Sequence, residues 1–355
     1  MTKVLSIDIG TGTKDVLLFD TSKNIENCIK MVLPSPTTVW AKRVKRLKED
    51  IFIYGFTVGG GPFAKALIEH VKKGFNVYMT RKTAFTIRGN LEEVKELGVN
   101  IVSSKPQNFN GAIMFIDEVN IPLLKMFIEM CGEKFDVDYI AIAVQDHGNP
   151  PKGHSARRFR FTIFRRNLSR CGDLANLSFT LKEVPSYHTR MKNALEACGN
   201  FASEGTLVMD TSLAAIVGCK CQIKDSKPSI LVNIGNSHTV IAIIKGDEVC
   251  AFAEHHTRLV NNPKKLAKLI IGLTEGDISD EEVYRDGGHG AIIEKAVGFN
   301  RIKRIIVTGP NRSLIESTGL NFEYANPGGD VMMTGTVGLV EAAHRKFCFK
   351  RPNLK

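Results

Sequence analysis

Residues 5–19 read Leu-Ser-Ile-Asp-Ile-Gly-Thr-Gly-Thr-Lys-Asp-Val-Leu-Leu-Phe, and residues 231–244 read Leu-Val-Asn-Ile-Gly-Asn-Ser-His-Thr-Val-Ile-Ala-Ile-Ile. Each stretch has an apolar run, a polar side chain, a glycine, small hydroxyl or amide residues, and then a second apolar run. This pattern predicts a strand, a tight turn and a returning strand, and it occurs twice. An internal repeat of this kind constrains the whole fold. Two such hairpins that face each other would form a clamp for a polyphosphate.

The length and composition indicate a globular protein of about two domains. The chain has 355 residues, of which 43% are hydrophobic and 24% are charged. No uninterrupted apolar stretch approaches the ~18 residues that span a bilayer, and the N-terminus has no signal-peptide pattern. We therefore expect a cytoplasmic protein that does not associate with membranes.

The net charge and the cysteines narrow the classes of ligand. A net charge of +11 attracts anions, which include phosphorylated small molecules, nucleic acids and acidic proteins. The eight cysteines are scattered, and one residue separates the closest pair, Cys219 and Cys221. Zinc and iron–sulfur ligands typically have a two-residue gap, so we expect free cysteines instead.

The rest of the chain reads as strands alternating with helices, which predicts an α/β fold. Each hairpin repeat begins a set of three predicted strands, at 3–9, 15–20 and 26–33 and again at 230–234, 239–245 and 248–254. Helices are predicted after the second set at 264–273, 289–298 and 331–346. Pro228 marks the predicted boundary between a first domain, 1–227, with an inserted α/β segment at about 50–135, and a second domain, 228–355.

The first hairpin carries the groups that a phosphate site needs. Asp8, at the end of a strand, can hold Mg²⁺ through water, because Mg²⁺ prefers few carboxylates and several waters. A dinucleotide-binding fingerprint is excluded, since that motif requires a helix after the glycines and a strand follows here. The turn supplies two glycines whose amides can approach an anion, two hydroxyl donors and one cation, namely Gly10, Gly12, Thr11, Thr13 and Lys14.

These residues make the chain resemble the ASKHA superfamily, which contains the actin-like, sugar-kinase and Hsp70-type ATPases. Residues 8–14 resemble its phosphate-1 element, 233–239 its phosphate-2 element, 305–311 its adenosine element, and 328–330 with the closing helix its second connecting element. The resemblance is weakest over about 50–135. It implies two ribonuclease-H-like domains with ATP and Mg²⁺ in the cleft between them. The further nucleotide-binding residues that it implies are Asn233, Gly235, Asn236, Ser237, His238, Thr239, Thr308, Gly309, Pro310, Asn311, Gly328 and Gly329.

The details resemble more closely an uncharacterised family in that superfamily, whose members often carry the name pyruvate formate-lyase activating enzyme. That name implies a radical-SAM cluster held by a Cys-x3-Cys-x2-Cys motif, which the sequence lacks, so we reject this activity. The phosphate-2 element usually begins with aspartate, whereas this chain has Asn233, and an amide is a poorer metal partner. Asp8 would therefore hold Mg²⁺ alone or together with Asp146.

The segment Val144–Gly148 follows a strand that should lie parallel to the first one, so its polar residues should emerge at the same sheet edge as Gly10. It resembles the connecting element that supplies a catalytic carboxylate in related proteins. Asp146 is the candidate general base, and Gln145 is the candidate for positioning a water molecule. The alternative is an ordinary polar exit from a strand into a loop.

Several histidines are expected to approach the same cleft. His238 lies in the second hairpin turn, and the strand that ends at His255 and His256 should return to its level. His147, and His289 within a glycine-rich turn, can join them. Neutral imidazoles could bind a transition metal or shuttle protons, whereas the alternative is a set of separate surface histidines.

Two further segments are candidate anion sites. The turn Gly59–Pro62 opens a predicted helix, whose amides could bind a substrate phosphate or carboxylate, although proline in a first turn also has structural reasons. The stretch from Arg157 to Arg170 is strongly basic, and its alternating phenylalanines predict a strand with one buried and one cationic face. We expect it to dock a small anionic substrate or an acidic protein partner, with nucleic acid as the less favoured partner and a plain solvated face as the other alternative.

Taken together, these features predict a protein that binds ATP and Mg²⁺ and acts as an ATPase or phosphotransferase on an anionic substrate. One alternative is a non-enzymatic nucleotide-dependent switch or partner-binding module, which Asn233 favours. Another is a metal-dependent enzyme that uses the histidines, and a third is an RNA-binding protein.

Overall fold

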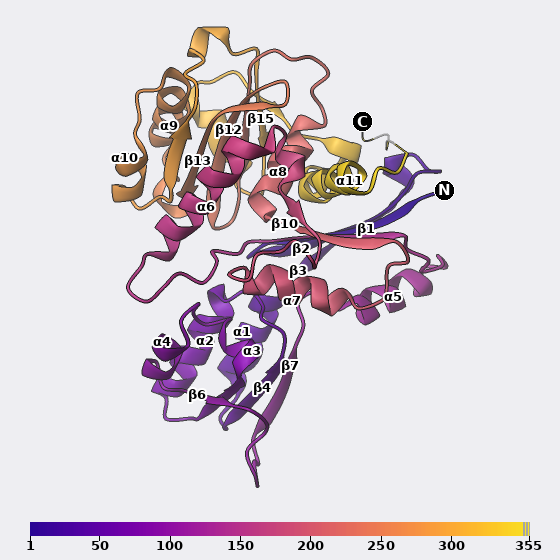
Figure 1. Cartoon of the computed structure of the whole chain (residues 1–355), viewed down its shortest axis with the longest axis vertical. Helices are drawn as coiled ribbons and strands as arrows, with labels where there is room; N and C mark the ends of the chain where they lie inside the picture. The colour runs from indigo at the N-terminus through magenta and orange to yellow at the C-terminus, as the bar shows by residue number, and fades with distance from the viewer. Residues whose placement is uncertain (351, 353, 355) are drawn as a thin grey trace.

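The first predicted hairpin lies at the centre of a six-stranded sheet in the computed structural model, which describes residues 1–350, 352 and 354, with the side chains of 170 and 171 left out (Figure 1). Strand β1 pairs antiparallel with β2 and parallel with β8, and β8 pairs parallel with β10. Across the sheet the strands are β3 (Ile29–Pro34), β2 (Thr13–Asp20), β1 (Lys3–Ile9), β8 (Tyr139–Val144), β10 (Gly205–Met209) and β9 (Ser178–Phe179).

The second predicted hairpin is the centre of a second six-stranded sheet. Strand β11 pairs antiparallel with β12 and parallel with β15, as β1 does with β2 and β8. The two sheets therefore share one plan, in which a three-strand meander is followed by parallel strands on the other side of the first strand. The strands run in the order β14 (Gly290–Ile293), β13 (Glu248–His256), β12 (His238–Lys245), β11 (Ser229–Ile234), β15 (Arg304–Thr308) and β16 (Glu323–Tyr324).

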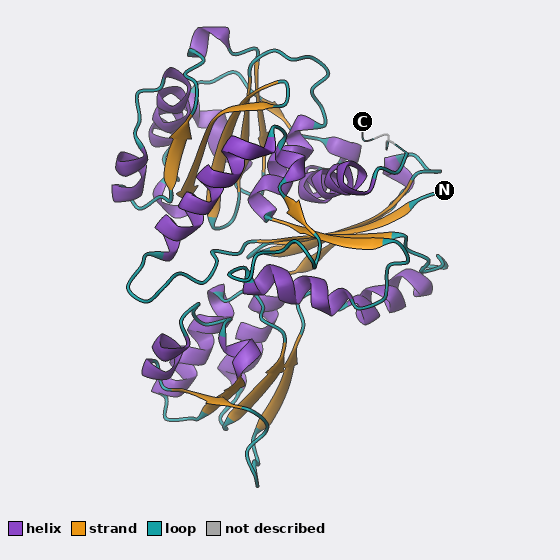
Figure 2. Cartoon of the chain, in the orientation of Figure 1, coloured by secondary structure: helices purple, strands orange, loops and turns teal. Residues whose placement is uncertain are grey.

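Two helices, α8 (Thr211–Lys220) and α11 (Thr334–Phe347), pack between the two sheets (Figure 2). They approach so closely that a Cβ on Gly338 would lie 1.9 Å from the Ala214 carbonyl oxygen, and one on Gly218 would lie 1.8 Å from the Thr334 carbonyl oxygen. One buried cluster joins both helices to side chains of both sheets, such as Leu207 and Leu231. The two sheets are thus held by a common core.

A third sheet lies between β3 and β8 in the sequence and has a core of its own, below the first sheet in Figure 1. Its four parallel strands are β6 (Val99–Val102), β5 (Val77–Thr80), β4 (Ile51–Gly55) and β7 (Ala112–Ile116). Its helices are α1 (Pro36–Arg46), α2 (Gly61–Lys72), α3 (Arg81–Ala84) and α4 (Leu91–Glu96). The next helix, α5 (Ile121–Met130), packs instead on the core of the first sheet. The separately packed segment is therefore shifted toward the N-terminus relative to the predicted 50–135.

Two predictions of secondary structure are wrong. The basic stretch predicted as a strand is a helix, α6 (Ala156–Cys171), and residues 290–293, predicted as part of a helix, form the edge strand β14. The remaining α-helices of the described residues are α7 (Thr189–Cys198), α9 (Pro263–Glu275) and α10 (Asp280–Arg285). Within the described part of the chain, no helix has the length and apolar character needed to cross a membrane.

Candidate functional site

A cavity of about 650 Å³ opens where the two hairpin turns meet the third sheet. Its wall includes the ends of β1 and β11, the loop after β8, the start of α11 and the loop that precedes α2. The carboxyl ends of parallel strands β1 and β8 lie at one sheet edge, which is a general location for ligand sites in such sheets. The cavity therefore collects residues from both six-stranded sheets and from the loops and helices around the third sheet.

The two hairpin turns contact each other at this cavity. The hydroxyl of Ser237 donates to the hydroxyl oxygen of Thr11 at 2.9 Å. A Cβ on Gly12 would lie 2.1 Å from the Asn236 side-chain nitrogen, so a larger residue there would displace the Asn236 side chain. The amides of Gly10 and Gly235 each donate to the carbonyl oxygen three residues later, at 2.9 Å. The two turns thus close in the same way and face each other.

A pair of carboxylates, Asp8 and Asp15, lies on the cavity wall. The two residues are directly opposite in the β1–β2 ladder, and both line the cavity. Thr211 donates its hydroxyl to Asp8 Oδ1 at 2.5 Å, and a Cβ on Gly335 would lie 2.0 Å from Asp8 Oδ2. Burial raises the pKa of Asp8 to about 7. Burial and the nearby charge of Asp8 raise the pKa of Asp15 to about 8.

Asp15 was not expected from the sequence as a site residue. Its Oδ1 is buried and has no hydrogen-bond partner among the described residues, while Thr13 donates to Oδ2 at 3.2 Å. A buried carboxylate without a full set of partners costs free energy and marks a functional candidate. The signal in the sequence was a charged residue at the start of an otherwise apolar strand.

Lys14, predicted to contact the phosphates, faces away from the cavity. Its ammonium group donates to the backbone carbonyl of Val119 at 2.6 Å. Neighbouring residues of a strand point to opposite faces, so Lys14 and Asp15 cannot both face the cavity. Thr239 in the second hairpin is likewise fully buried, and its hydroxyl bonds that of Thr257 at 3.1 Å. We correct the predicted positions of Lys14 and Thr239 accordingly.

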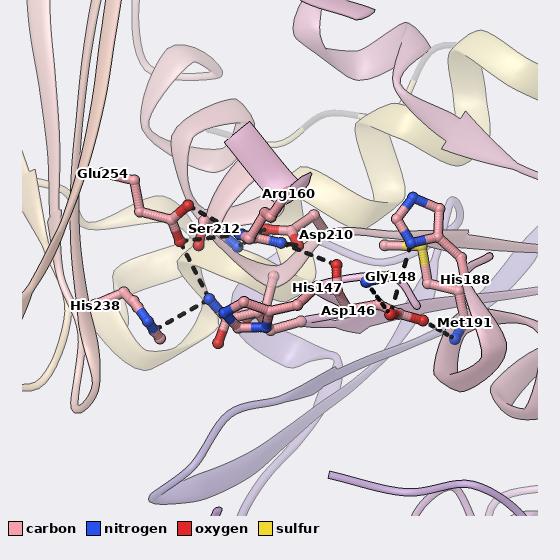
Figure 3. Close-up of polar contacts among 12 residues, drawn as sticks. Asp146, His147, Gly148, Arg160, His188, Met191, Asp210, Ser212, His238 and Glu254 are labelled. Atoms are coloured by element: carbon pink, nitrogen blue, oxygen red, sulfur yellow. Dashed lines mark hydrogen bonds and ion pairs between the residues drawn. The ribbon is translucent and has the colours of Figure 1, made fainter. Parts of the chain in front are cut away.

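Asp146, the predicted general base, has its carboxylate in a nest of backbone amides (Figure 3). Gly148 donates to Oδ1 at 2.8 Å and Met191 to Oδ2 at 3.0 Å, and His188 Nδ1 lies 3.6 Å from Oδ1. Burial alone would raise the pKa of Asp146, but His188 and the two amides outweigh it and lower the pKa. These contacts favour a role in holding the loop after β8 rather than in proton transfer or metal binding.

Gln145 lines the cavity, and its side-chain nitrogen donates to two groups. It bonds Glu254 Oε1 at 3.1 Å and His238 Nδ1 at 3.0 Å. Because a carboxylate only accepts hydrogen bonds, the contact with Glu254 fixes which end of the amide faces the histidine. Gln145 therefore links the first sheet to the second.

A buried ionic network lies behind Gln145 (Figure 3). Arg160 of α6 bonds both oxygens of Asp210, at 2.7 and 3.1 Å, and both oxygens of Glu254, at 2.9 and 3.0 Å. Burial alone would raise the pKa of Glu254, but Arg160 and the nearby histidines lower it well below its usual range. Arg160 had been predicted on an exposed cationic face, and the structure buries it.

Three of the predicted histidines converge beside this network. One ring nitrogen each of His147, His238 and His289 lies within 4.8 Å of the others, and His147 Nε2 is 3.2 Å from His289 Nε2. Burial lowers the pKa values of His147, His238 and His289 to about 3, 4 and 2, so the rings are neutral near pH 7. The ring of His256 lies 4.8 Å from that of His238. His255 instead bonds Asp286 at 2.9 Å, away from the cluster.

The predicted adenosine element reaches the cavity, whereas the two glycines predicted to follow it do not. Thr308, Gly309 and Pro310 line the cavity, and Asn311 donates its side-chain amide to the Gly235 carbonyl at 2.9 Å. The helix expected after this turn is a 3-10 helix, residues 312–318. Gly328 packs on Ile25, and neither Gly328 nor Gly329 belongs to the described cavity wall. The cavity wall does include the start of α11 and the predicted nucleotide-binding residues Asn233, Asn236 and Ser237.

The remaining candidate segments divide between the cavity and the surface. Residues 59–61 line the cavity, where the Gly59 amide donates to Glu118 at 2.9 Å. Arg158 and Arg165 pair with Asp280 at 3.2 and 3.1 Å, so these parts of the basic stretch contact the second sheet's own helix α10. Arg170 lies outside the described side chains. The binding of an anionic partner at α6 stays a prediction. Fewer arginines of this helix are available for it than expected, because Arg158 and Arg165 are already paired with Asp280.

No curated protein matches this chain at a significant level. A family model does match residues 58–314, which is more than half of the chain. The match spans the loop before α2, the connecting segment with Gln145, the second hairpin and the adenosine-like turn. The chain belongs to the family described as "Putative pyruvate format-lyase activating enzyme (DUF1786)".

Proposed function

We propose that the chain is an ATP-dependent enzyme of the ASKHA superfamily, which binds ATP and Mg²⁺ between its two hairpin turns. The observation that carries the proposal is the meeting of two alike glycine-bearing turns, through Thr11 and Ser237, on the wall of one cavity. The name of the family refers to the activation of pyruvate formate-lyase, which is radical-SAM chemistry. The sequence lacks the cysteine motif that this chemistry requires.

The repeated sheet plan supports the superfamily assignment. Both sheets have an antiparallel meander followed by strands parallel to the first, in the orders β3-β2-β1-β8-β10 and β13-β12-β11-β15-β16. This is the arrangement that two ribonuclease-H-like domains would have. The third sheet, which contributes residues 59–61 and Arg88 to the cavity, would then hold the phosphoryl acceptor.

The charges of the cavity favour a metal-bound nucleotide over a free one. Asp8 and Asp15 face it, Lys14 faces away, and Arg190 is paired with Glu118 at 2.8 Å. A free triphosphate would meet these carboxylates beside the turns, since Arg88, the other arginine on the described cavity wall, belongs to the side of the third sheet. Asp8 and Asp15 offer the oxygen ligands that Mg²⁺ prefers. The ion would neutralise the phosphate oxygens during phosphoryl transfer.

The residues of the chain would act mainly by positioning. The hydroxyls of Thr11 and Ser237 lie at the turn tips, where they can donate to phosphate oxygens once the turns separate. Gln145 is held by Glu254 and His238 at the cavity wall, where it can orient a water or an acceptor hydroxyl. The carboxylate of Asp146 is occupied by its contacts with backbone amides and His188, so we assign it neither proton transfer nor metal binding. We therefore assign the metal to Asp8 and Asp15.

Nucleotide binding tests the proposal directly. Thermal unfolding of the full chain would be followed with ATP plus Mg²⁺, with ATP plus a chelator, and with Mg²⁺ alone. A ligand at about 100 times its dissociation constant adds about 2.7 kcal/mol of stability, and we expect this only with ATP plus Mg²⁺. Asp15→Asn and Asp8→Asn should lose the effect, while the exposed Glu248→Gln should keep it. No stabilisation of the wild type by any nucleotide would overturn the proposal.

A non-enzymatic nucleotide switch is the second candidate, and one observation favours it. Asn233 stands where the superfamily usually has aspartate, and it lies on the cavity wall. Turnover separates the two candidates. In Gln145→Ala, which leaves Asp8 and Asp15 in place, an enzyme should lose ATP hydrolysis, whereas a switch should show nucleotide binding and the same trace hydrolysis in the variant and the wild type.

A further inference from the structure

Four histidines from four separate segments gather beside Gln145. His147 follows β8, His238 begins β12, His256 ends β13 and His289 precedes β14. Their ring centroids lie between 4.8 and 6.0 Å apart for the pairs in contact. The proposed ATP site uses only His238, which holds Gln145, so the rest of the cluster calls for its own explanation.

The spacing of three of the rings fits a metal ion. A tetrahedral metal with bonds of about 2.0–2.1 Å to imidazole places its nitrogen ligands roughly 3.3 Å apart. The Nε2 atoms of His147 and His289 are 3.2 Å apart, and the ligand atoms of these two and of His238 lie within 4.8 Å of one another. Bringing the widest of these separations from 4.8 Å to the tetrahedral spacing needs a movement of up to about 1.5 Å.

Two ring nitrogens of the cluster are left without partners. His238 Nε2 and His289 Nδ1 are buried, and neither has a hydrogen-bond partner among the described residues. Buried polar atoms are nearly always bonded in native proteins. His238 Nε2 is an exception on the cavity wall and points to a ligand, whereas His289 Nδ1 lies across its ring from the Nε2 atom that faces His147. His147 and His238 line the cavity, so a ligand can reach them from there.

The charges around the cluster favour a cation over an anion. Beside the rings, Arg160 lies with two carboxylates, those of Asp210 and Glu254. One guanidinium and two carboxylates leave one net negative charge in a buried place. A metal dication would be attracted to this position, while a phosphate would be repelled.

We propose that His147, His238 and His289 bind a divalent transition-metal ion such as Zn²⁺, Fe²⁺ or Co²⁺. Imidazole is a ligand for this class of metal rather than for Mg²⁺. Three protein ligands leave a fourth position for water or a substrate atom, as in catalytic zinc sites, and two of the three ligands, His147 and His238, line the cavity. The proposal does not depend on ATP binding.

Gln145 would adjust when the metal binds. Its nitrogen now donates to His238 Nδ1, which places the ring proton of His238 on Nε2. A metal at Nε2 would move that proton to Nδ1, so Gln145 would have to present its oxygen to this nitrogen and give up its contact with Glu254. Partners of this kind orient metal-binding histidines, and Gln145 is thus the positioning residue for the site.

Cobalt binding to the full chain tests the proposal. The protein would be stripped of metal with a chelator and titrated with Co²⁺, without nucleotide and with excess Mg²⁺ to occupy carboxylate sites. We expect one Co²⁺ per chain, with the strong visible absorption of four-coordinate cobalt and imidazole neighbours in its X-ray absorption spectrum. His238→Ala and His289→Ala should weaken binding by roughly a hundredfold or more, and Gln145→Ala by about tenfold.

His154→Ala is the matched control, because His154 also lines the cavity but is exposed and lies outside the cluster. It should bind Co²⁺ as the wild type does. The proposal is overturned by a folded wild type that takes up no Co²⁺, by a cobalt spectrum with only oxygen neighbours, or by equal affinity in the folded histidine variants. The spectrum of the wild type decides the matter even where a variant fails to fold. Failure here leaves the nucleotide proposal untouched, since the titration contains no nucleotide.

Discussion

Two adjacent residues of β2, Lys14 and Asp15, determine the charge of the cavity. The pleat of the strand sends Asp15 toward Asp8 and sends Lys14 through the other face to the Val119 carbonyl. Exchange of their directions would place a cation in the cavity where the structure has a carboxylate. The acidic character of the site is therefore a consequence of strand register.

The burial of Lys14 predicts a pH-dependent stability. Burial lowers the pKa of Lys14 from 10.5 to about 8, while the unfolded chain keeps the ordinary value. Between these two pH values the unfolded chain holds a proton that the folded protein has released, so the free energy of unfolding rises as pH increases. Each pKa unit corresponds to about 1.4 kcal/mol, which gives a gain on the order of 3 kcal/mol.

Urea unfolding at a series of pH values, compared between the wild type and Lys14→Met, measures this effect. The difference between the two proteins cancels the titration of other groups. We expect the wild type to gain stability relative to Lys14→Met from pH ~8 to ~10.5. A difference that stays constant over this range would show that Lys14 is not buried as an ammonium group.

Sequence reasoning finds the residue types of this site but not all of their directions. Asp8, Gly10, Thr11 and Ser237 lie where the hairpin pattern predicts. The pattern does not show whether Lys14 or Asp15 faces the cavity. A strand that is buried on both faces has no alternation of polar and apolar residues to indicate which side chains share a face. The amides that engage Asp146 come from positions 148 and 191, and no local pattern predicts the second one.

At the scale of elements, α6 joins parts of the chain that are distant in sequence. It follows β8 of the first sheet, yet Arg158 and Arg165 pair with Asp280 of α10, and Arg160 bridges Asp210 and Glu254 of the two sheets (Figure 1). One helix thus fastens both halves through a buried cation. The more exposed ion pairs of Arg158 and Arg165 could not hold the two halves together by themselves, since such pairs contribute little to the free energy of unfolding.

Replacement of Arg160 by methionine should destabilise the protein by about 3–5 kcal/mol, because Asp210 and Glu254 would be left buried without their cation. Arg158→Met on the same helix is the control. Its guanidinium is one-third exposed, so its loss should cost at most about 1 kcal/mol. Chemical denaturation of both variants gives the comparison. Equal losses would mean that the buried network is not the fastening between the halves.

The hairpins of the fold are predictable, whereas α6 and β14 are not. In the hairpins the turn chemistry and the apolar runs agree, so the local signal matches the tertiary structure. In α6 the alternation of Phe159, Phe161 and Ile163 imitates a strand, although Phe161, Phe164 and Leu168 are the buried set and follow helical spacing. The edge strand β14 exists because β13 offers a free edge, which is information from outside its own residues.

For the whole molecule, the contact between the turns implies a closed clamp. The two sheets share one core around α8 and α11, while the turn tips touch only through small polar groups such as Thr11 and Ser237. The tight packing of the helices makes them the natural pivot, and the tips are the part that can separate. Nucleotide entry between the tips would then require the lobes to open about this pivot.

A disulfide across the tips tests this opening. The hydroxyl oxygens of Thr11 and Ser237 are 2.9 Å apart, so cysteines at both positions can bond with little movement. The oxidised Thr11→Cys, Ser237→Cys double variant should lose stabilisation by ATP plus Mg²⁺ and regain part of it on reduction. The Thr11→Cys single variant, treated with the same oxidant, controls for the native cysteines and for the lost hydroxyl. If the oxidised double variant binds nucleotide as well as its reduced form does, the ligand reaches the cavity from the side of the third sheet, and the turns are a fixed wall rather than a clamp.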